Sequence, residues 1–354
     1  MSELGTLLAD TVTRLFRDLV TKESLEAAEQ GAWPDRLWRA LEEGGLTLPL
    51  VPETQGGAGG RWEDAEVVVR AAGRHAAPVP LAETIVAAWL LAGAGLEVPT
   101  GPLTLAPVRA GEALRLTRKG AALEGTATRV PWGAAAGHVV ALAEADGRPV
   151  VALVAAGAAR VTPGKSLALE PRDTLAWDAA PIVAAAPAAA GLGADALQVY
   201  GALVRAAQMA GGLESVLEQA VRYAGERRQF GRAIGSFQAI QQQLAVLAGH
   251  VAAAGAAAAH AFRAADRRDP AFEVAAAKVR AGEAAGVGAA IAHAVHGAIG
   301  FTYEHSLHFA TRRLWSWRAE FGSESRWAAT LGRAVVARGA DALWTDLTAR
   351  SVSG

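Results

Sequence analysis

The spacing of apolar residues in the first part of the chain is that of helices. Trp33, Leu37 and Leu41 follow i, i+4 and i+8, which places them on one helix face, and Gly44 soon after them is a natural helix end. Similar helical stretches follow. The pattern therefore predicts a helical domain over residues 1–98.

The pattern changes between residues 99 and 186. Short apolar runs at 139–142 and 150–154 are separated by the dipeptide 146–147, Asp-Gly, which favours a tight turn between strands. This spacing predicts a small β domain over residues 99–186. The alanine-rich residues 184–190, which include one proline, are expected to form a linker to the next domain.

Helical spacing returns after the linker. Ile240, Leu244 and Leu247 follow i, i+4 and i+7, and Ser236 stands where its hydroxyl is expected to cap that helix. The pattern predicts a helical domain over residues 187–354. Helices, strands and helices in that order give an α+β, mainly α, fold class. The chain has neither βαβ alternation nor a GxGxxG motif, which argues against a Rossmann fold.

Composition narrows the classes of function. Of the 354 residues 52% are hydrophobic, many of them alanine, and the formal net charge is -1, which offers no electrostatic basis for binding nucleic acid. The chain contains no cysteine, so disulfides, cysteine-ligated metal sites and cysteine nucleophiles are excluded. Candidate chemistry is therefore confined to the other polar and charged residues.

The longest apolar run, residues 245–262, is mostly alanine and glycine and contains two histidines. Alanine is a weak membrane anchor, so this run predicts a buried bundle helix rather than a membrane span. The N-terminal residues are amphipathic and carry both charges, unlike a signal peptide. We therefore expect a soluble, cytoplasmic protein without a membrane span.

The segment Glu226–Gln241, ERRQFGRAIGSFQAIQ, is the richest in candidate chemistry. It joins the polar end of one predicted helix to the start of the next, and it contains arginines, aromatic rings and glycines. Guanidinium groups are always charged, and their planar donors match phosphate oxygens. Such a junction suits a large anionic ligand with an aromatic part.

This segment closely resembles the flavin-binding signature of the acyl-CoA dehydrogenase family. Two further segments are similar to that family in the expected order: residues 51–59, VPETQGGAG, and residues 295–305, VHGAIGFTYEH. The resemblance implies an N-terminal helical domain, a small middle β-barrel and a C-terminal four-helix bundle. It also implies FAD as the cofactor.

The resemblance further implies that the segment grips the diphosphate of an FAD held by a neighbouring subunit. The residues implied to bind the cofactor are Arg227, Gln229, Phe230, Ile234, Gln238 and Gly297. Two simpler interpretations stay open. The arginines can be a solvated helix end that neutralises last-turn carbonyls, and Gly297 with Gly300 can form an ordinary tight turn.

The reaction implied by the resemblance oxidises an acyl-CoA thioester to 2-enoyl-CoA: a glutamate takes the α proton and the flavin accepts the β hydride. Family members place that glutamate at one of two positions, which fall here on Gly201 and Phe321. Neither residue is acidic. Glu320 is the candidate catalytic base, although one residue along a helix is a rotation of about 100°. Its alternative interpretation is a surface glutamate paired with a neighbouring arginine, and Glu214 is a weaker candidate.

Other parts of the family pattern are missing. Residues 104–107, Thr-Leu-Ala-Pro, stand where the family has a Thr-Glu pair and a turn that hold the flavin ring. Ala202, Ala294 and Ala298 replace an arginine, a glutamine and a glycine of the family pattern. The resemblance therefore implies that the outward-facing clamp is kept while the chain's own flavin and substrate pocket is eroded.

The histidines form two H-x-x-H pairs, which by themselves could suggest a metal site. Spacing of i, i+3 suits only some geometries, and no acidic partners are evident, so we expect no metal. Tryptophans and arginines gather at residues 312–327, where packing or a subunit interface is the simpler interpretation.

Three functions stay open. The first is an FAD-dependent acyl-CoA dehydrogenase, an oxidoreductase of lipid metabolism. The second is a catalytically silent subunit, whose clamp residues hold an FAD bound mainly by a partner chain. The third is a structural helical protein without flavin. The partners implied are an acyl-CoA substrate, an electron-transfer acceptor and, in a homo- or hetero-oligomer, another acyl-CoA dehydrogenase-like chain.

Overall fold

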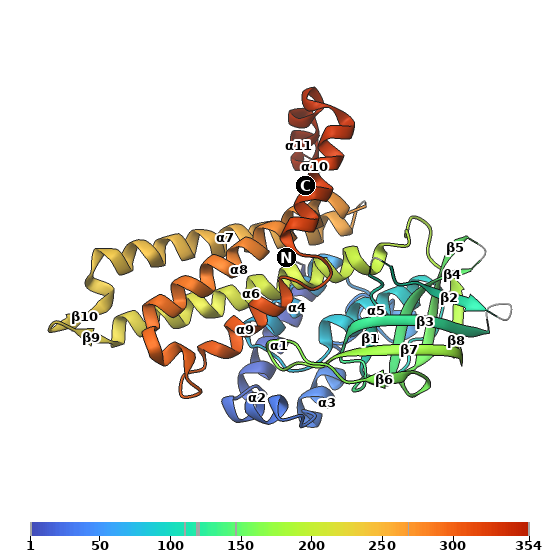
Figure 1. The fold of residues 1–354 in the computed structure, drawn as a ribbon, viewed down its shortest axis with the longest axis horizontal. Coiled ribbons are helices and arrows are strands. Elements are labelled where there is room, and N and C mark those ends of the chain that lie inside the picture. Colours follow the sequence, from blue (N-terminus) through green and yellow to red (C-terminus); the bar gives the residue numbers. More distant parts are fainter. Residues whose placement is uncertain (1, 110, 118–120, 146, 268, 353–354) are drawn as a thin grey trace. The chain divides into compact units, whose positions relative to one another are not determined.

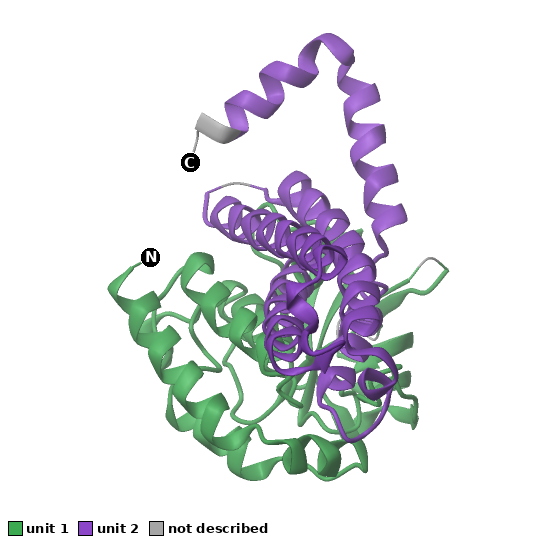
Figure 2. Ribbon diagram, turned by 90° about the vertical axis from the view of Figure 1, so that its left-hand side faces the viewer, with its two compact units in different colours: residues 1–201 green, residues 202–354 purple. Residues whose placement is uncertain are grey.

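The structure is a computed structural model that describes residues 2–109, 111–117, 121–145, 147–267 and 269–352. It divides into two compact units, residues 1–201 and residues 202–354, called here the first and the second unit (Figure 2). Helices dominate and a mixed sheet accompanies them (Figure 1), so the predicted mainly helical α+β class is confirmed. The predicted domain boundaries at residues 98 and 186 stay predictions.

The first unit begins with helices whose ends follow local sequence signals. The hydroxyl of Ser2 accepts a hydrogen bond from the N–H of Gly5 (2.8 Å) and caps the first helix. The predicted helix around Leu37 ends at Gly44, as expected. The helices are α1 (Glu3–Leu19), α2 (Lys22–Glu29), α3 (Asp35–Glu43), α4 (Trp62–Arg74) and α5 (Leu81–Gly93), with the short 3-10 helix η1 (Glu53–Gln55).

The sheet of the first unit has the strand order β6-β7-β3-β2-β4-β5-β8, and β1 pairs with β4. Its strands are β1 (Leu103–Leu105), β2 (Leu114–Thr117), β3 (Ala122–Pro131), β4 (His138–Ala145), β5 (Arg148–Ala155), β6 (Arg160–Thr162), β7 (Arg172–Pro181) and β8 (Ala184–Pro187), and the 3-10 helix η2 (Ala156–Ala158) follows β5. In the described part of the chain this sheet is open, so the expected closed barrel is not found. The edge strands β6 and β8 are only three and four residues long.

The predicted strands at 139–142 and 150–154 lie in β4 and β5, which pair antiparallel along their whole length. Asp146 of the predicted turn lies outside the described residues. The linker prediction for 184–190 is wrong at its start, because Ala184–Pro187 is the edge strand β8 and pairs with β5. Pro187 ends that strand, where a missing N–H is tolerated.

Long alanine-rich helices build the second unit. Gly288 allows them to pack closely, since a Cβ there would come within 2.8 Å of the Leu213 side chain and 3.0 Å of Leu247. The elements are α6 (Ala196–Glu226, which starts in the first unit), β9 (Arg228–Gln229), β10 (Arg232–Ala233), η3 (Ile234–Ser236), α7 (Gln238–Ala265), α8 (Ala271–His296), η4 (Gly297–Phe301), α9 (Leu307–Trp317), α10 (Glu324–Arg338), η5 (Ala340–Ala342) and α11 (Leu343–Val352). That four of these helices form a bundle of their own stays a prediction.

Helix α7 differs from its prediction in two respects. It is buried on one face only, and Val246 on the other face is 51% exposed. Ser236 does not cap it, because the η3 turn intervenes and the Ser236 hydroxyl donates to the Ala233 carbonyl instead (2.7 Å). By length and composition, α7 and the segment Ala271–Phe301 could each cross a membrane, a property that core helices of soluble proteins share. The absence of a membrane span stays a prediction.

Candidate functional site

A β-hairpin stands between α6 and α7, at one end of the long helices (Figure 1). Its two turn residues, Phe230 and Gly231, have φ values of 51° and 78°, as a two-residue turn with both central residues left-handed requires. Glycine adopts that conformation freely, whereas phenylalanine rarely does. The N–H of Ile234 donates to the Arg227 carbonyl (2.8 Å) and closes the base of the hairpin.

The hairpin presents cations and rings to solvent. The side chains of Arg227, Arg228 and Arg232 are exposed, and Phe230 is 91% exposed. The Arg232 guanidinium lies over the Phe237 ring, 4.1 Å from its centroid. A large ring held in solvent on an uncommon backbone conformation gains little from its own chain, so the arrangement suits contact with a molecule outside it.

The other predicted cofactor residues on this segment flank the turn. Gln229 is exposed on β9, Ile234 is half-buried in η3, and Gln238 is exposed in the first turn of α7. The structure therefore gathers five of the six predicted residues on the hairpin and its flanks.

The sixth residue, Gly297, follows α8, whose end is joined to the last turn of α6 through aromatic contacts. Tyr223, one helical turn before Arg227, stacks on His296 with ring centroids 4.5 Å apart. His305 packs edge-on against both rings, 4.6 Å from His296 and 6.0 Å from Tyr223. The predicted cofactor residues thus share one end of the second unit.

The turn after α8 needs glycine for two different reasons. Gly297 has φ 65° and ψ -148°, a conformation that is essentially open to glycine alone. At Gly300 a Cβ would come within 3.0 Å of the His296 Cβ and 3.2 Å of His293 Nδ1. The chain's own geometry accounts for a tight turn here, and an approach of Gly297 to a cofactor stays a prediction.

The donor set of the hairpin fits the diphosphate of FAD. Several guanidinium groups lie together on a short exposed segment, and each can donate two parallel hydrogen bonds to phosphate oxygens. Rings at Phe230 and Phe237, 6.1 Å apart, can pack against the aromatic parts of the same molecule. FAD binding by these residues stays a prediction that the geometry favours.

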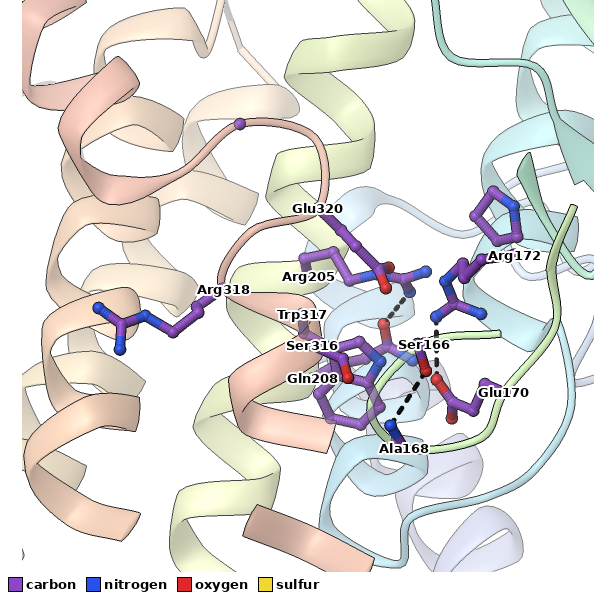
Figure 3. Close-up of polar contacts among 12 residues, drawn as sticks. Ser166, Ala168, Glu170, Arg172, Arg205, Gln208, Ser316, Trp317, Arg318 and Glu320 are labelled. Atoms are coloured by element: carbon purple, nitrogen blue, oxygen red, sulfur yellow. Dashed lines mark hydrogen bonds and ion pairs between the residues drawn. The ribbon is translucent and has the colours of Figure 1, made fainter. Parts of the chain in front are cut away.

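Glu320 is deeply buried, so the alternative interpretation of it as a surface glutamate is wrong. Its Oε2 accepts a hydrogen bond from Nε of Arg205 at 2.7 Å, and the two side chains are 6% and 1% exposed (Figure 3). Arg205 also donates to Oε1 of Gln208. Catalysis by Glu320 stays a prediction, and it would require a carboxylate that already neutralises a buried cation to take a substrate proton as well.

Phe321, to which the resemblance assigns the family's late glutamate position, serves packing. Phe321 is buried with φ 50°, and its ring lies 5.6 Å from the Arg205 guanidinium. Its carbonyl accepts a hydrogen bond from Nε1 of Trp327 (2.9 Å). The loop between α9 and α10 is therefore tied to both α6 and α10.

Lys278 of α8 reaches the same loop from the other side. Its Nζ is fully buried and donates to the carbonyls of Trp317, Arg318 and Gly322 at 3.1, 2.8 and 2.8 Å. Burial lowers the pKa of Lys278 to about 7. This loop is thus surrounded by buried charge.

The histidines pack as aromatic rings. His293 stacks on Phe301 and Trp315, with centroid distances of 4.0 and 5.6 Å. Burial lowers the pKa of His293 and of His296, and the neighbouring His296 and His308 lower that of His293 further. Among the described residues no group of three His, Cys, Asp or Glu side chains could hold a metal ion.

In the sheet of the first unit, the residues that the resemblance assigns to the family's ring-binding motif serve the fold. Thr104 and Leu105 are fully buried in β1, and the Thr104 hydroxyl donates to the Pro131 carbonyl. Neither side chain is available to a ligand in this conformation.

Sequence reasoning missed Arg205, Gln208 and Lys278. The available signal was a charge within an apolar helical stretch, ALVRAAQMA for Arg205 and VAAAKV for Lys278. Such a charge predicts burial with a partner. Helical periodicity cannot name the partner, because Glu320 lies 115 positions from Arg205.

Two models of known protein families match this chain. Residues 2–97 match the family model described as acyl-CoA dehydrogenase, N-terminal domain, and residues 189–336 match that of the acyl-CoA dehydrogenase C-terminal domain. Together the two matches span well over half of the chain.

Similar proteins and structures carry related names. Acyl-CoA dehydrogenase IpdE2 of Mycobacterium tuberculosis is 31% identical over 311 residues, covering 87% of this chain and 89% of that protein. Acyl-CoA dehydrogenase FadE34 of the same organism is 33% identical over 300 residues, covering 82% of this chain but 41% of FadE34. A crystal structure of the ChsE4-ChsE5 complex from Mycobacterium tuberculosis has a TM-score of 0.85 at 27% identity and covers 94% of this chain and 97% of the other.

Proposed function

Because this chain belongs to the acyl-CoA dehydrogenase family, we propose that it is the subunit of a hetero-oligomeric acyl-CoA dehydrogenase that supplies the FAD diphosphate clamp to a catalytic partner chain. The family consists of FAD-dependent oxidoreductases that act on acyl-CoA thioesters in lipid metabolism. That this chain supplies the clamp to a partner, and that it works in the cytoplasm, are parts of our proposal.

One contrast within the second unit carries this proposal. The exposed hairpin keeps the cationic and aromatic groups that a phosphate-bearing cofactor needs. At the position that the resemblance assigns to the family's base, the ring of Phe321 is buried, and the adjacent Glu320 is engaged by Arg205. A chain with the outward clamp but without a free carboxylate at that position is suited to assist another chain's active site.

The similar proteins support an assembly of two kinds of chain. The match to FadE34 covers 41% of that protein, so this chain corresponds to about two fifths of a longer relative. The ChsE4-ChsE5 structure, which shares 27% sequence identity with this chain, is described by its name as a complex of ChsE4 and ChsE5. Each observation agrees with a second acyl-CoA dehydrogenase-like chain beside this one.

In the proposed assembly each part has a limited task. FAD, when bound, supplies the hydride acceptor, and an electron-transfer protein would take its electrons onward. Arg227, Arg228 and Arg232 would bind and orient the diphosphate, and Phe230 would shield it from water. The partner chain would supply the carboxylate for the α proton, so that an acyl-CoA leaves as 2-enoyl-CoA.

The test compares the chain purified alone with the chain purified together with a co-expressed acyl-CoA dehydrogenase-like partner. We expect a colourless chain in the first preparation, and in the second an equimolar complex with flavin absorbance that reduces an artificial electron acceptor with acyl-CoA. A lone chain that is yellow and oxidises acyl-CoA would contradict the proposal and favour Glu320 as its base. A chain that never retains flavin would favour a structural role.

A further inference from the structure

The last two helices, α10 and α11, form an arm that has almost no core of its own. They project from the long helices of the second unit and meet at the bend around η5 (Figures 1 and 2). Within α10, all of which is described, only Trp327 is buried, and no side chain among residues 343–350 of α11 is buried. Helices of 15 and 10 residues are marginal in water without tertiary packing. The arm therefore gains stability from any surface that covers it.

The two helices of the arm are fastened to each other on one side. Val335 of α10 and Leu343 of α11 line the same small cavity, of about 60 Å³, so both side chains face the inside of the bend. Three residues after each of them stand Arg338 and Asp346, which form two hydrogen bonds, Nε to Oδ2 at 2.6 Å and Nη2 to Oδ1 at 2.7 Å. Three residues are a rotation of about 300° on a helix, so this ion pair marks one side of the arm.

The other side of the arm is apolar. Val336 and Trp344 each follow a cavity-lining residue by one position, a rotation of about 100° that turns them away from the ion pair. Val336 is 80% exposed and Trp344 is 75% exposed. By the same rotation Ala329, Gly332 and Leu347 lie on this side, which carries no charged residue of the described part of either helix. These five residues are called here the arm face.

The charged residues of the arm lie on its other sides. Arg350 lines the cavity on the inside of the bend, and its Nη1 lies 2.9 Å from Oε1 of Glu273 in α8. Arg333 donates to the Thr330 hydroxyl (3.1 Å), and both positions are turned to the outside of the bend. In a contact between two copies related by a two-fold axis the same patch of both copies meets, so a charge on the patch would face its like. The arm face avoids this repulsion, which favours a second copy of this chain as its partner.

Gly332 gives the arm face a place for a large ring. A Cβ on Gly332 would meet no described atom within 4 Å, so the backbone there is open. In a two-fold contact the same two residues meet twice, once in each direction. Trp344 of one copy can therefore lie over Gly332 of the other, and the reverse, with Val336 and Leu347 around them. Tryptophan is enriched among the residues that dominate the energy of interfaces.

We propose that two copies of this chain associate through their arm faces, by a two-fold contact in which the Trp344 ring of each copy covers Gly332 of the other. Helix α11 lies beyond residues 189–336, so the match to the family's C-terminal domain does not imply this contact. The arm contacts α8 at Glu273, near the helix start, whereas the predicted cofactor residue Gly297 follows its end, about 35 Å away along the helix. The contact therefore leaves the hairpin accessible to another chain, and the inference goes beyond the proposed function.

Sedimentation velocity of the chain purified alone tests this proposal. We expect a dimer at micromolar concentration. In Trp344→Glu the dissociation constant of the dimer should rise by roughly thirtyfold or more, because a central ring is lost and each new charge faces its like. In Gly332→Leu a similar rise is expected, since the leucine occupies the place of the ring, while it raises helix propensity and its Cβ has open space in its own chain. Leu7→Glu, at a 64% exposed apolar residue of the first unit, is the matched control and should leave the dimer unchanged.

A native chain that stays monomeric overturns the proposal. So does a dimer whose dissociation constant is the same in the native chain, Trp344→Glu and Gly332→Leu, because the copies then meet through another surface. Thermal unfolding of each variant shows whether the chain is folded, and Gly332→Leu decides the question if Trp344→Glu is not.

The absence of cysteine permits a second test at single positions. Leu347→Cys and Thr345→Cys each place one thiol on α11, the first on the arm face and the second turned away from it by about 160°. A benzophenone photo-cross-linker attached to that thiol, in the chain alone and in the complex with the co-expressed partner, should join two copies efficiently from Leu347→Cys and poorly from Thr345→Cys. Cross-links from the arm face to the catalytic partner instead would overturn the proposal, whether or not the complex holds FAD.

Discussion

The hairpin and the α9–α10 loop, two regions of the second unit, use the same residue types in opposite ways. On the hairpin, Arg227 and its neighbours are exposed and their charges face solvent. At the loop, Arg205 is 1% exposed and engaged with Glu320. An exposed guanidinium is available to an external anion, whereas a buried one must be neutralised by its own chain. The first region suits binding and the second suits packing.

Substitutions of exposed and of buried charges are therefore expected to change the free energy of unfolding by different amounts. Exposed charges contribute little to folding, so replacing them should affect a ligand and leave the fold intact. Buried paired charges contribute little as a pair, but removing one partner leaves the other unsolvated and unpaired. The first two predictions below test the two sides of this contrast, and the other two compare positions near the hairpin at which backbone conformation matters.

The largest effect is expected at the buried pair. Glu320→Gln leaves the Arg205 charge buried without its counterion and should lower the free energy of unfolding by about 3–5 kcal/mol. Urea denaturation measures the loss. Asp35→Asn, which breaks the exposed pair between Asp35 and Arg39, is the control and should cost about 0.5 kcal/mol or less. The double variant Arg205→Met with Glu320→Met should recover most of the loss, and a single-variant loss near the control value would contradict the assignment.

Next in size is the effect of Arg227→Ala on the cofactor. Removing one charge-assisted contact should weaken FAD binding to the assembled complex by about 1.5–3 kcal/mol, or roughly ten- to a hundredfold. The dissociation constant, from titration of flavin-depleted complex, measures this change. Arg263→Ala, in the last turn of the same helix that begins beside the hairpin, is the matched exposed control. Equal affinity of the two variants would remove Arg227 from the clamp.

Gly297→Ala should cost about 1–3 kcal/mol of unfolding free energy, because alanine cannot adopt φ 65° with ψ -148° without strain. Gly249→Ala is the matched control within α7, where a Cβ would meet nothing within 4 Å. It should stabilise the chain by about 0.5–1 kcal/mol. Thermal unfolding distinguishes the two, and equal shifts would show that the turn after α8 relaxes easily.

The smallest effect on stability is expected at Phe230. Asparagine accepts a left-handed conformation in such turns, so Phe230→Asn should change the unfolding free energy by about 1 kcal/mol or less, and in the favourable direction. The same variant should lower FAD retention in the complex, because the exposed ring is gone. Retention equal to that of the native complex would show that the ring has no part in binding.

Local signals in the sequence predicted a good part of the fold. The helix around Leu37, its end at Gly44 and the β4–β5 pair all follow from spacing and turn residues within a few positions. The closed barrel implied by the resemblance was not found, and the linker prediction was wrong at residues 184–187, for a common reason. Whether a short alanine strand such as β8 joins a sheet, and whether that sheet closes, depends on partners far along the chain.

The residues of the candidate site also fall into those that local sequence located and those that depend on distant parts of the chain. The sequence by itself located the candidate clamp residues of the hairpin, because the arginines, the turn residues, the end of α6 and the start of α7 lie within sixteen consecutive positions, Glu226–Gln241. Only the tertiary structure decided the state of Glu320 and Lys278. Their partners come from α6 and from the loop after α9, many tens of residues away, and the balance between desolvation and ion pairing that governs them exists only once those segments are packed together.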